Sequence, residues 1–179
     1  MLLVVLYSYN NIAMKKHPLN LIFKKQLELD THIHKNHNIT YQDVETERVI
    51  ALAVELGELA NEVRCFKFWS LKKPSAKEII LEEYVDGIHF ITSLAITFRM
   101  KPQQILIVPV KKNLHKKFLS GHFHYLFSSL QELDTADGIG SWYTSYLMLG
   151  QELGFSLSEI EKAYLKKCKI NHQRQDNKY

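Results

Sequence analysis

Residues 49–63 read Val49-Ile-Ala-Leu-Ala-Val-Glu-Leu-Gly-Glu-Leu-Ala-Asn-Glu-Val63, and apolar side chains recur along them every three or four positions. This period predicts a long helix with one apolar face. Three acids, Glu55, Glu58 and Glu62, stand at i, i+3 and i+7, so they border the apolar stripe instead of opposing it. The stretch therefore predicts a helical fold with a row of carboxylates next to its core.

A second acidic segment, Ile79-Ile-Leu-Glu-Glu-Tyr-Val-Asp-Gly-Ile-His-Phe-Ile91, follows the same design. It places Glu82, Glu83 and Asp86 among apolar positions of helical period, and residues 66–74 break the period between the two segments. Because this connection is short, we expect two antiparallel helices whose acidic faces meet.

The other periodic segments predict further helices. With the acidic pair at about 44–63 and 75–98, helices are expected at about 20–37, 114–133, 139–153 and 156–175. Motifs that resemble capping boxes precede three of the six: Thr40-Tyr-Gln-Asp43, Ser75-Ala-Lys-Glu78 and Ser156-Leu-Ser-Glu159. Residues 101–109 are compatible with a short strand, an extended connection or a helix end.

The composition fits one all-α domain. The 179 residues are 46% hydrophobic and 23% charged, and only seven glycines and four prolines interrupt the periodic stretches. We expect a bundle of about five to six helices. Residues 14–179 form the domain in this interpretation, and residues 1–13 are a non-native or disordered extension.

Several classes of partner are excluded by charge and patterning. A net charge of +4 is too small to indicate a nucleic-acid-binding surface. The apolar start, residues 1–7, is too short to cross a bilayer and has no preceding positive charge. Cys65 and Cys168 lack the spacing of a disulfide scaffold or redox motif, which favours a reduced, cytoplasmic protein.

Carboxylates gathered from two paired helices need a counter-charge. Two of them about 6 Å apart repel by roughly 3 kcal/mol at an effective dielectric constant of about 20. All-oxygen ligands suit hard cations such as Mg²⁺ or Mn²⁺, and two such ions bind a polyphosphate while activating a water for attack on phosphorus. The acids therefore predict a metal site for phosphate chemistry.

Two other interpretations of these acids remain open at this point. Each acidic pair alone is common on exposed helices, where it forms ion pairs with lysine or arginine. Asp86 and His89 have the i, i+3 spacing of a di-iron bundle, but no second copy of that motif is visible. His89 itself is interpreted either as a hydrogen-bonded wall residue or as a contact to a base.

The acidic pair resembles the all-α nucleoside triphosphate pyrophosphatases, a superfamily that includes MazG-like enzymes and the dimeric dUTPases. Three strings look like the dimeric dUTPase branch: residues 53–70, residues 82–90 and the closing Lys167-Cys-Lys-Ile-Asn-His-Gln-Arg-Gln-Asp176. The resemblance extends from about Gln26 to the C-terminus, and residues 101–153 contribute little beyond helical character.

The resemblance implies roles for particular residues. Glu55, Glu58, Glu83 and Asp86 would hold two or more Mg²⁺ ions, with Mn²⁺ as a substitute, and Glu55 would also position the attacking water. The substrate-binding positions are Gln26 and Asp30 on the first helix, Lys67 and Trp69 after the second, His89 on the third, and Lys167, Asn171 and Arg174 on the last. Of these, His89 is inferred from its place beside Asp86 and not from a family motif.

The resemblance also implies an activity and an assembly. The expected reaction is hydrolysis of dUTP between its α- and β-phosphates, which gives dUMP and pyrophosphate, by a homodimer. Alternatives are a pyrophosphatase specific for dCTP or for a broad range of triphosphates, and a non-catalytic helical interaction protein. Trp69 is either a packing surface for the nucleotide or a loop anchor in the core.

Two positions depart from the family pattern. Cys168 stands where the family usually has asparagine, and Lys178 where a glycine normally precedes the final tyrosine. Both changes predict an altered or weaker phosphate-binding end, because a thiol lacks the amide donors and lysine lacks the conformational freedom of glycine.

Overall fold

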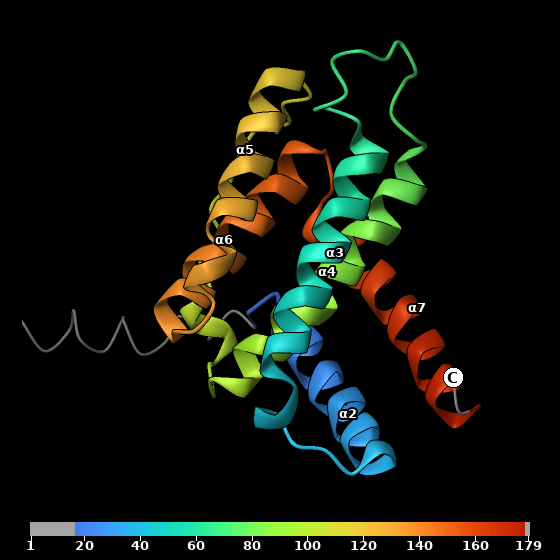
Figure 1. The fold of residues 1–179 in the computed structure, drawn as a ribbon, viewed down its shortest axis with the longest axis vertical. Helices are drawn as coiled ribbons and strands as arrows, with labels where there is room; N and C mark the ends of the chain where they lie inside the picture. The colour runs from blue at the N-terminus through green and yellow to red at the C-terminus, as the bar shows by residue number, and fades with distance from the viewer. Residues whose placement is uncertain (1–16, 178–179) are drawn as a thin grey trace, which may run out of the picture.

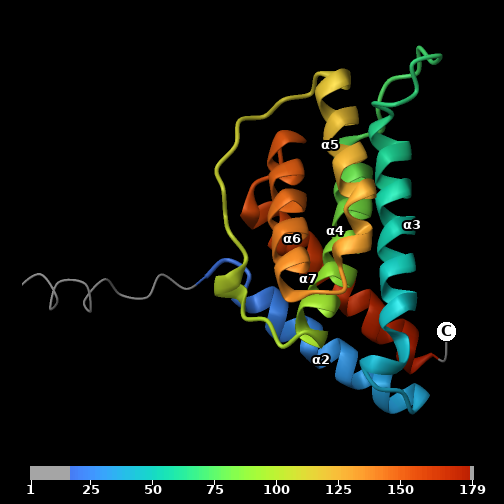
Figure 2. The same cartoon turned by 60° about the vertical axis from the view of Figure 1, so that its left-hand side comes forward.

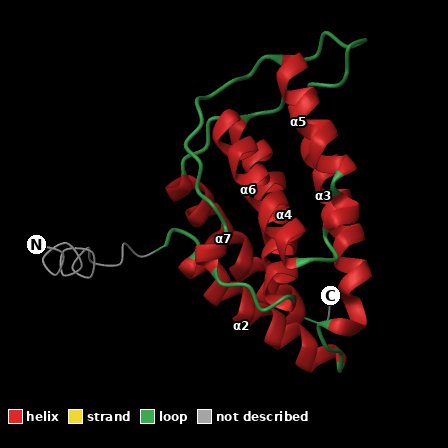
Figure 3. Cartoon of the chain, turned by 90° about the vertical axis from the view of Figure 1, so that its left-hand side faces the viewer, coloured by secondary structure: helices red, strands yellow, loops and turns green. Residues whose placement is uncertain are grey.

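The computed structural model describes residues 17–177, and these form a bundle of six α-helices with three short 3₁₀ turns and no strand (Figures 1 and 3). The helices are α2 (Asn20–His37), α3 (Glu45–Val63), α4 (Lys77–Thr97), α5 (Lys116–Ser128), α6 (Ala136–Glu152) and α7 (Leu157–Asp176). The predicted all-α bundle is confirmed. The predicted extension, residues 1–13, and Lys178 lie outside the described residues.

The two acidic segments form the antiparallel hairpin that the sequence predicts. Helix α3 runs to the loop at residues 64–76, and α4 returns alongside it (Figures 1 and 2). Helix α4 also packs against α2, α6 and α7, so it is buried on most of its circumference. Polar side chains on α4 that point inward can therefore reach partners on other helices, as Ser93 does when it donates to Asp30 of α2 (2.8 Å).

Only one of the three predicted capping boxes forms. Ser156 accepts a hydrogen bond from the Glu159 N–H (3.2 Å), and the Glu159 carboxylate accepts one from the Ser156 N–H (2.8 Å). At Thr40, the Asp43 carboxylate accepts from Thr40, but a 3₁₀ turn intervenes and α3 begins after Val44 without a side-chain cap.

The prediction of a capping box at Ser75 is also wrong. The N-cap of α4 is Ala76, whose methyl side chain cannot accept a hydrogen bond. The Ser75 hydroxyl donates instead to the Glu62 carboxylate, and the Ser75 N–H donates to the Glu62 carbonyl (3.0 Å). Ser75 thus ties the start of α4 to the end of α3 and closes the hairpin.

Helices α4 and α6 are joined by a reciprocal tyrosine pair. The rings of Tyr84 and Tyr146 stack with centroids 4.7 Å apart, and each hydroxyl donates to the backbone carbonyl of the other residue (3.0 Å). A glycine on the facing helix makes room for each ring. A Cβ added at Gly87 would lie 2.3 Å from the Tyr146 hydroxyl, and one at Gly150 would lie 2.5 Å from the Tyr84 ring.

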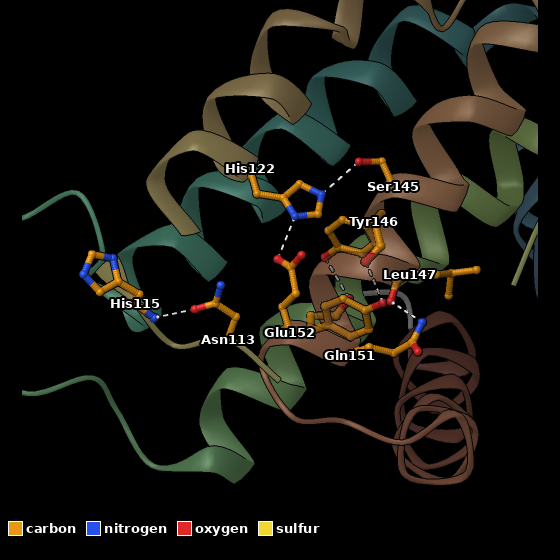
Figure 4. A network of polar contacts seen from close by, with 9 residues as sticks. Asn113, His115, His122, Ser145, Tyr146, Leu147, Gln151 and Glu152 are labelled. Carbon is orange, nitrogen blue, oxygen red and sulfur yellow. Dashed lines mark hydrogen bonds and ion pairs between the residues drawn. The ribbon is translucent and has the colours of Figure 1, made fainter. Parts of the chain in front are cut away.

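Helix α5 is tied to α6 by a histidine (Figure 4). His122 Nδ1 lies 2.8 Å from the Glu152 carboxylate and its Nε2 lies 2.9 Å from the Ser145 hydroxyl. The order of atoms is that of a serine hydrolase triad, but Ser145 is inside α6, where the backbone N–H groups form helical hydrogen bonds and build no oxyanion hole. The arrangement therefore stabilises the packing of α5 against α6 and is not a catalytic triad.

The segment between α4 and α5 is an extended connection with one 3₁₀ turn at Pro102–Gln104, which settles what the sequence left open (Figures 2 and 3). The Gln151 side chain holds it to α6 by accepting from the Val110 N–H (3.2 Å) and donating to the Val108 carbonyl (2.9 Å). Cys65 and Cys168 are both free and buried. No helix within residues 17–177 is long and apolar enough to cross a bilayer.

Candidate functional site

Three of the four predicted metal ligands form a compact carboxylate cluster. Glu55 and Glu58 of α3 and Glu83 of α4 each bring one oxygen to within 4.8 Å of the others. One helical turn separates the two acids on α3, and the antiparallel pairing brings Glu83 opposite them. Three oxygens at this separation suit a hard divalent cation.

The charge of this cluster is poorly compensated by the protein itself. Burial, followed by the charges of Asp86, Glu58 and Glu83, raises the pKa of Glu55 to about 7. Burial and the neighbouring acids, Asp86 first, also raise the pKa of Glu83. Raised pKa values mean that the site resists full ionisation in the absence of a counter-charge. The donor set and its strained charge state therefore fit a bound cation.

Asp86, the fourth predicted ligand, is engaged differently. Its carboxylate accepts a hydrogen bond from the Lys167 ammonium group at 2.6 Å, and Lys167 also reaches Glu82 at 3.2 Å. Burial raises the pKa of Asp86 even though Lys167 acts in the opposite direction. Asp86 is thus close enough to perturb Glu55 and Glu83 but is paired with a lysine from α7, outside the three-carboxylate cluster.

A cavity of about 370 Å³ opens beside the acids, between α2, α3, α4 and α7. Glu55 and Asp86 line it. So do six of the eight predicted substrate-binding residues: Gln26, Asp30, His89, Lys167, Asn171 and Arg174. The structure therefore brings residues from both ends of the sequence to the acidic hairpin, and its volume lies within the range of small-molecule sites.

The helix α2 side of this cavity contains a buried hydrogen-bond network. The Asp30 carboxylate accepts from Gln26 Nε2 (2.7 Å) and from the hydroxyls of Ser93 (2.8 Å) and Tyr41 (3.1 Å). Gln26 Oε1 lies 2.8 Å from His89 Nδ1 and accepts from the Tyr164 hydroxyl at 2.8 Å. The side-chain carbonyl of Gln26, a predicted substrate-binding residue, thus already accepts hydrogen bonds within the protein.

Sequence reasoning missed several members of this site. Ser93 and Tyr164 belong to no motif named from the sequence, Tyr41 was noted only as part of a capping motif, and Arg48 donates to the Tyr41 carbonyl (2.9 Å) while lining the cavity. Ser93 stands one helical turn after His89, so helical spacing alone could have suggested it. Tyr164 lies 138 residues from its partner Gln26, and no local pattern announces such a contact.

Lys67 and Trp69 do not reach the cavity. Both lie in the α3–α4 loop, which projects from the end of the hairpin opposite α2 (Figure 1). Trp69 is 66% exposed, and its ring packs edge-on against Phe66 and Phe68, so it is not an anchor in the core. Lys67 lies over the Phe66 ring, 5.5 Å from its centroid.

Cys168 lies on the side of α7 that faces α2. Its buried thiol approaches the Lys25 carbonyl at 3.9 Å, and it is not among the residues that line the cavity. The asparagine-to-cysteine departure therefore acts on helix packing. Its position gives no support to the expected weakening of phosphate binding.

Fold and site together define an all-α protein with a carboxylate-rich site on a central helical hairpin, next to a cavity for a small molecule. A family model described as dUTPase matches residues 18–179. The chain belongs to this all-α dUTPase family, a family of hydrolases in nucleotide metabolism. No curated protein matches the sequence.

Proposed function

We propose that the protein hydrolyses dUTP to dUMP and pyrophosphate with the help of two or more Mg²⁺ ions, for which Mn²⁺ can substitute. The observation that carries this proposal is the cluster of Glu55, Glu58 and Glu83 at the edge of a cavity lined by Lys167 and Arg174. Carboxylates recruit the metal and the basic residues recruit the triphosphate. Family membership supports the choice of dUTP as the substrate.

Each residue of the site has a part in this reaction. Glu55 belongs to the cluster and also lines the cavity, so it is placed to orient the attacking water and accept its proton. Glu58, Glu83 and Asp86 complete the metal-binding set. When bound, the cations neutralise the charge that develops on the phosphate oxygens.

Lys167 has two possible partners in this site, the Asp86 carboxylate and the phosphates of the nucleotide. In the protein alone it neutralises Asp86 at 2.6 Å. A cation held by Asp86 would supply this counter-charge instead, and the Lys167 ammonium group would then be available, beside Arg174, to bind the phosphates. Asp86 would then have a positive partner both before and after the cation binds.

The direct test is release of pyrophosphate from dUTP, dCTP, dTTP and ATP, each with Mg²⁺ and with a chelator. Metal-dependent release from dUTP supports the proposal, and the other nucleotides measure how narrow the specificity is. Release from all four at similar rates would replace dUTP by a broad range of triphosphates. No release from any of them would refute the enzymatic function.

We also propose that the protein is a homodimer. Large apolar side chains are exposed on α5 and on the segment before it: Leu106, Leu114, Phe118, Tyr125 and Phe127 are each at least 41% exposed. Met148 of α6 lines a shallow depression with Leu106 and Tyr125 and another with Phe118. A surface of this kind is typical of a contact between subunits.

A further inference from the structure

Two histidines and an aspartate gather on the seam between α2 and α7, outside the site described above. His32 Nε2 lies 3.0 Å from the Asp176 carboxylate, and the rings of His32 and His172 have centroids 5.4 Å apart. None of the three lines the cavity or belongs to the carboxylate cluster of α3 and α4. His32, His172 and Asp176 are called the seam cluster below.

The parallel packing of two helices brings these side chains together. Helices α2 and α7 run side by side in the same direction (Figure 1), with Lys25 meeting Cys168 and His32 meeting Asp176 farther along. His172 and Asp176 stand at i, i+4 on α7, so both project from one face, one turn apart. His32 of α2 therefore contacts both of them.

The spacings in the seam cluster resemble those of ligands on one tetrahedral ion. Ligand atoms bound at about 2.0–2.1 Å in that geometry are about 3.3 Å apart, and two imidazole rings bound through nitrogen have centroids about 5 Å apart. The observed values are 3.0 Å between nitrogen and oxygen and 5.4 Å between centroids. Only His172 has to turn, since its ring nitrogens lie more than 4.8 Å from at least one of the other two ligand atoms. A partly exposed side chain changes rotamer readily.

The chemistry of the donors selects a transition metal. Imidazole nitrogen suits Zn²⁺, Ni²⁺ and Cu²⁺, whereas oxygen ligands suit Mg²⁺ and Ca²⁺. Glu28, one turn before His32 on α2, adds negative charge nearby. The pKa of Glu28 is lowered by the hydrogen bond from Lys25 and, more weakly, by the charge of His172, so this carboxylate lies within electrostatic reach of the cluster. Two nitrogens, one carboxylate and a nearby acid suit Zn²⁺.

We propose that His32, His172 and Asp176 bind one Zn²⁺ ion, with water as the fourth ligand, and that this ion joins α2 to α7. The proposal does not depend on the dUTPase function. Gln26 of α2 and Arg174 of α7 line the cavity, so the ion holds together two helices that form its walls. Because the three ligands meet only when these helices are packed, binding also stabilises the fold.

An ordinary surface ion pair is the competing explanation of the contact between His32 and Asp176. Their side chains are 31% and 65% exposed, and pairs at the surface contribute little to stability. Such a pair involves only two of the three side chains and predicts no response to a metal. The two explanations therefore differ in what Zn²⁺ does and in whether His172 takes part.

The first experiment is a calorimetric titration of Zn²⁺ into the untagged full-length protein in excess Mg²⁺, which does not compete well for imidazole nitrogen. We expect His32→Ala and Asp176→Asn each to weaken Zn²⁺ binding by at least about tenfold. The matched control is His37→Ala, which removes another exposed histidine of α2 that contacts α7, through Gln175 at 3.0 Å. It should keep the wild-type affinity. Unchanged Zn²⁺ binding in His32→Ala, or an equal loss in His37→Ala, would overturn the proposal.

A spectroscopic readout on the wild-type protein needs no variant to fold. Two-bond proton–nitrogen correlations of histidine-labelled protein report metal binding at each ring nitrogen. One equivalent of Zn²⁺ in excess Mg²⁺ should shift the ring signals of His32 and His172 and leave those of His37 unchanged, and a chelator should reverse the shifts. No shift at His32 and His172, or an equal shift at His37, would refute the proposal whether or not the protein hydrolyses dUTP.

Discussion

At the scale of single residues, Glu55 stands in surroundings that oppose its ionisation. Burial and three neighbouring acids raise its pKa to about 7, whereas an exposed glutamate ionises well below that value. Nothing in the stability of the helix requires an acid there, because the adjacent Leu56 and Leu52 already supply the apolar face. A carboxylate whose ionised form is destabilised by its surroundings is a suitable ligand for a cation, because the cation supplies the missing counter-charge.

The first prediction concerns Glu58. Glu58→Gln removes one carboxylate of the cluster while keeping the shape of the side chain, so we expect dUTP turnover to fall by at least about 100-fold. The Mg²⁺-induced rise in Tm should also shrink, because binding to the folded state alone stabilises it.

The matched control for this prediction is Glu47→Gln, the same charge change at an exposed position on the same helix. It should retain both the turnover and the Mg²⁺ response. Near-normal activity in Glu58→Gln, measured by pyrophosphate release, would contradict the metal-site assignment.

At the scale of helices, the bundle depends on contacts that local motifs describe only in part. The capping box at Ser156 is local, and it forms as the sequence predicts. Ser75 stands in an equivalent sequence pattern, but its hydroxyl donates a hydrogen bond to Glu62 of the preceding helix. The close approach of α4 and α6 depends on Gly87 and Gly150, whose importance appears only when the two tyrosine rings are in place.

The second prediction is a pH dependence at the start of α7. The hydrogen bond from Lys77, followed by those from Ser156, lowers the pKa of Glu159 to about 2 from an ordinary value of 4.5. A lowered pKa means that this stabilisation is present above pH 4.5 and is lost as the pH falls toward 2. The difference in Tm between wild type and Glu159→Gln should therefore be present at pH 7 and shrink below pH 4.5.

Glu161→Gln provides the comparison, since it makes the same charge change on the same helix without touching the cap. Its difference from wild type should lack the decrease that is expected for Glu159→Gln below pH 4.5. A Glu159→Gln difference that stays constant down to pH 2 would show that the carboxylate charge contributes nothing at this helix end.

The third prediction concerns helix packing. Gly150→Ala adds a Cβ that would lie 2.5 Å from the buried Tyr84 ring, and we expect a loss of about 1–3 kcal/mol of unfolding free energy from overpacking. Gly121→Ala on α5 is the control, because nothing lies within 4 Å of its added Cβ. It should stabilise the protein by about 0.5–1 kcal/mol through helix propensity. Denaturant unfolding measures both, and equal effects would argue against the tyrosine–glycine contact.

At the scale of the whole molecule, α4 joins the bundle to the site. It packs against four other helices, so Glu83, Asp86 and His89 on its successive turns face α3, α7 and α2 in the same region. The walls of the cavity come from segments at both ends of the described chain. The other side of the bundle, at α5, exposes apolar side chains that the single chain leaves uncovered.

The fourth prediction tests the proposed dimer. Phe118 is 50% exposed on α5, and Phe118→Glu should raise the dissociation constant of the dimer by at least about tenfold, because a buried charge would replace an apolar contact. Analytical ultracentrifugation over a range of concentrations measures the change. Leu27→Glu, an exposed apolar position on α2, should leave the dimer intact. A wild-type protein that sediments as a monomer at all concentrations would refute the homodimer.

The sequence predicted the elements of this fold well, because most of them follow from local periodicity. The first helix has the expected bounds, Asn20–His37, and the acidic hairpin has the expected orientation. Six of the eight predicted substrate residues line one cavity. The exceptions are Lys67 and Trp69, whose loop position follows from the sequence but whose direction in space does not.

What the sequence determined by itself is the set of helices and the placement of acids beside their apolar faces, because both depend on spacings within a few turns. Only the tertiary structure decided how the polar atoms are paired. Gln26 forms hydrogen bonds with His89 and Tyr164, Asp86 with Lys167, and Ser75 with Glu62. The two residues of each pair are between 13 and 138 positions apart in the sequence. Such pairings depend on which helices meet, since a buried polar group takes the nearest suitable partner in space, whatever its distance along the chain.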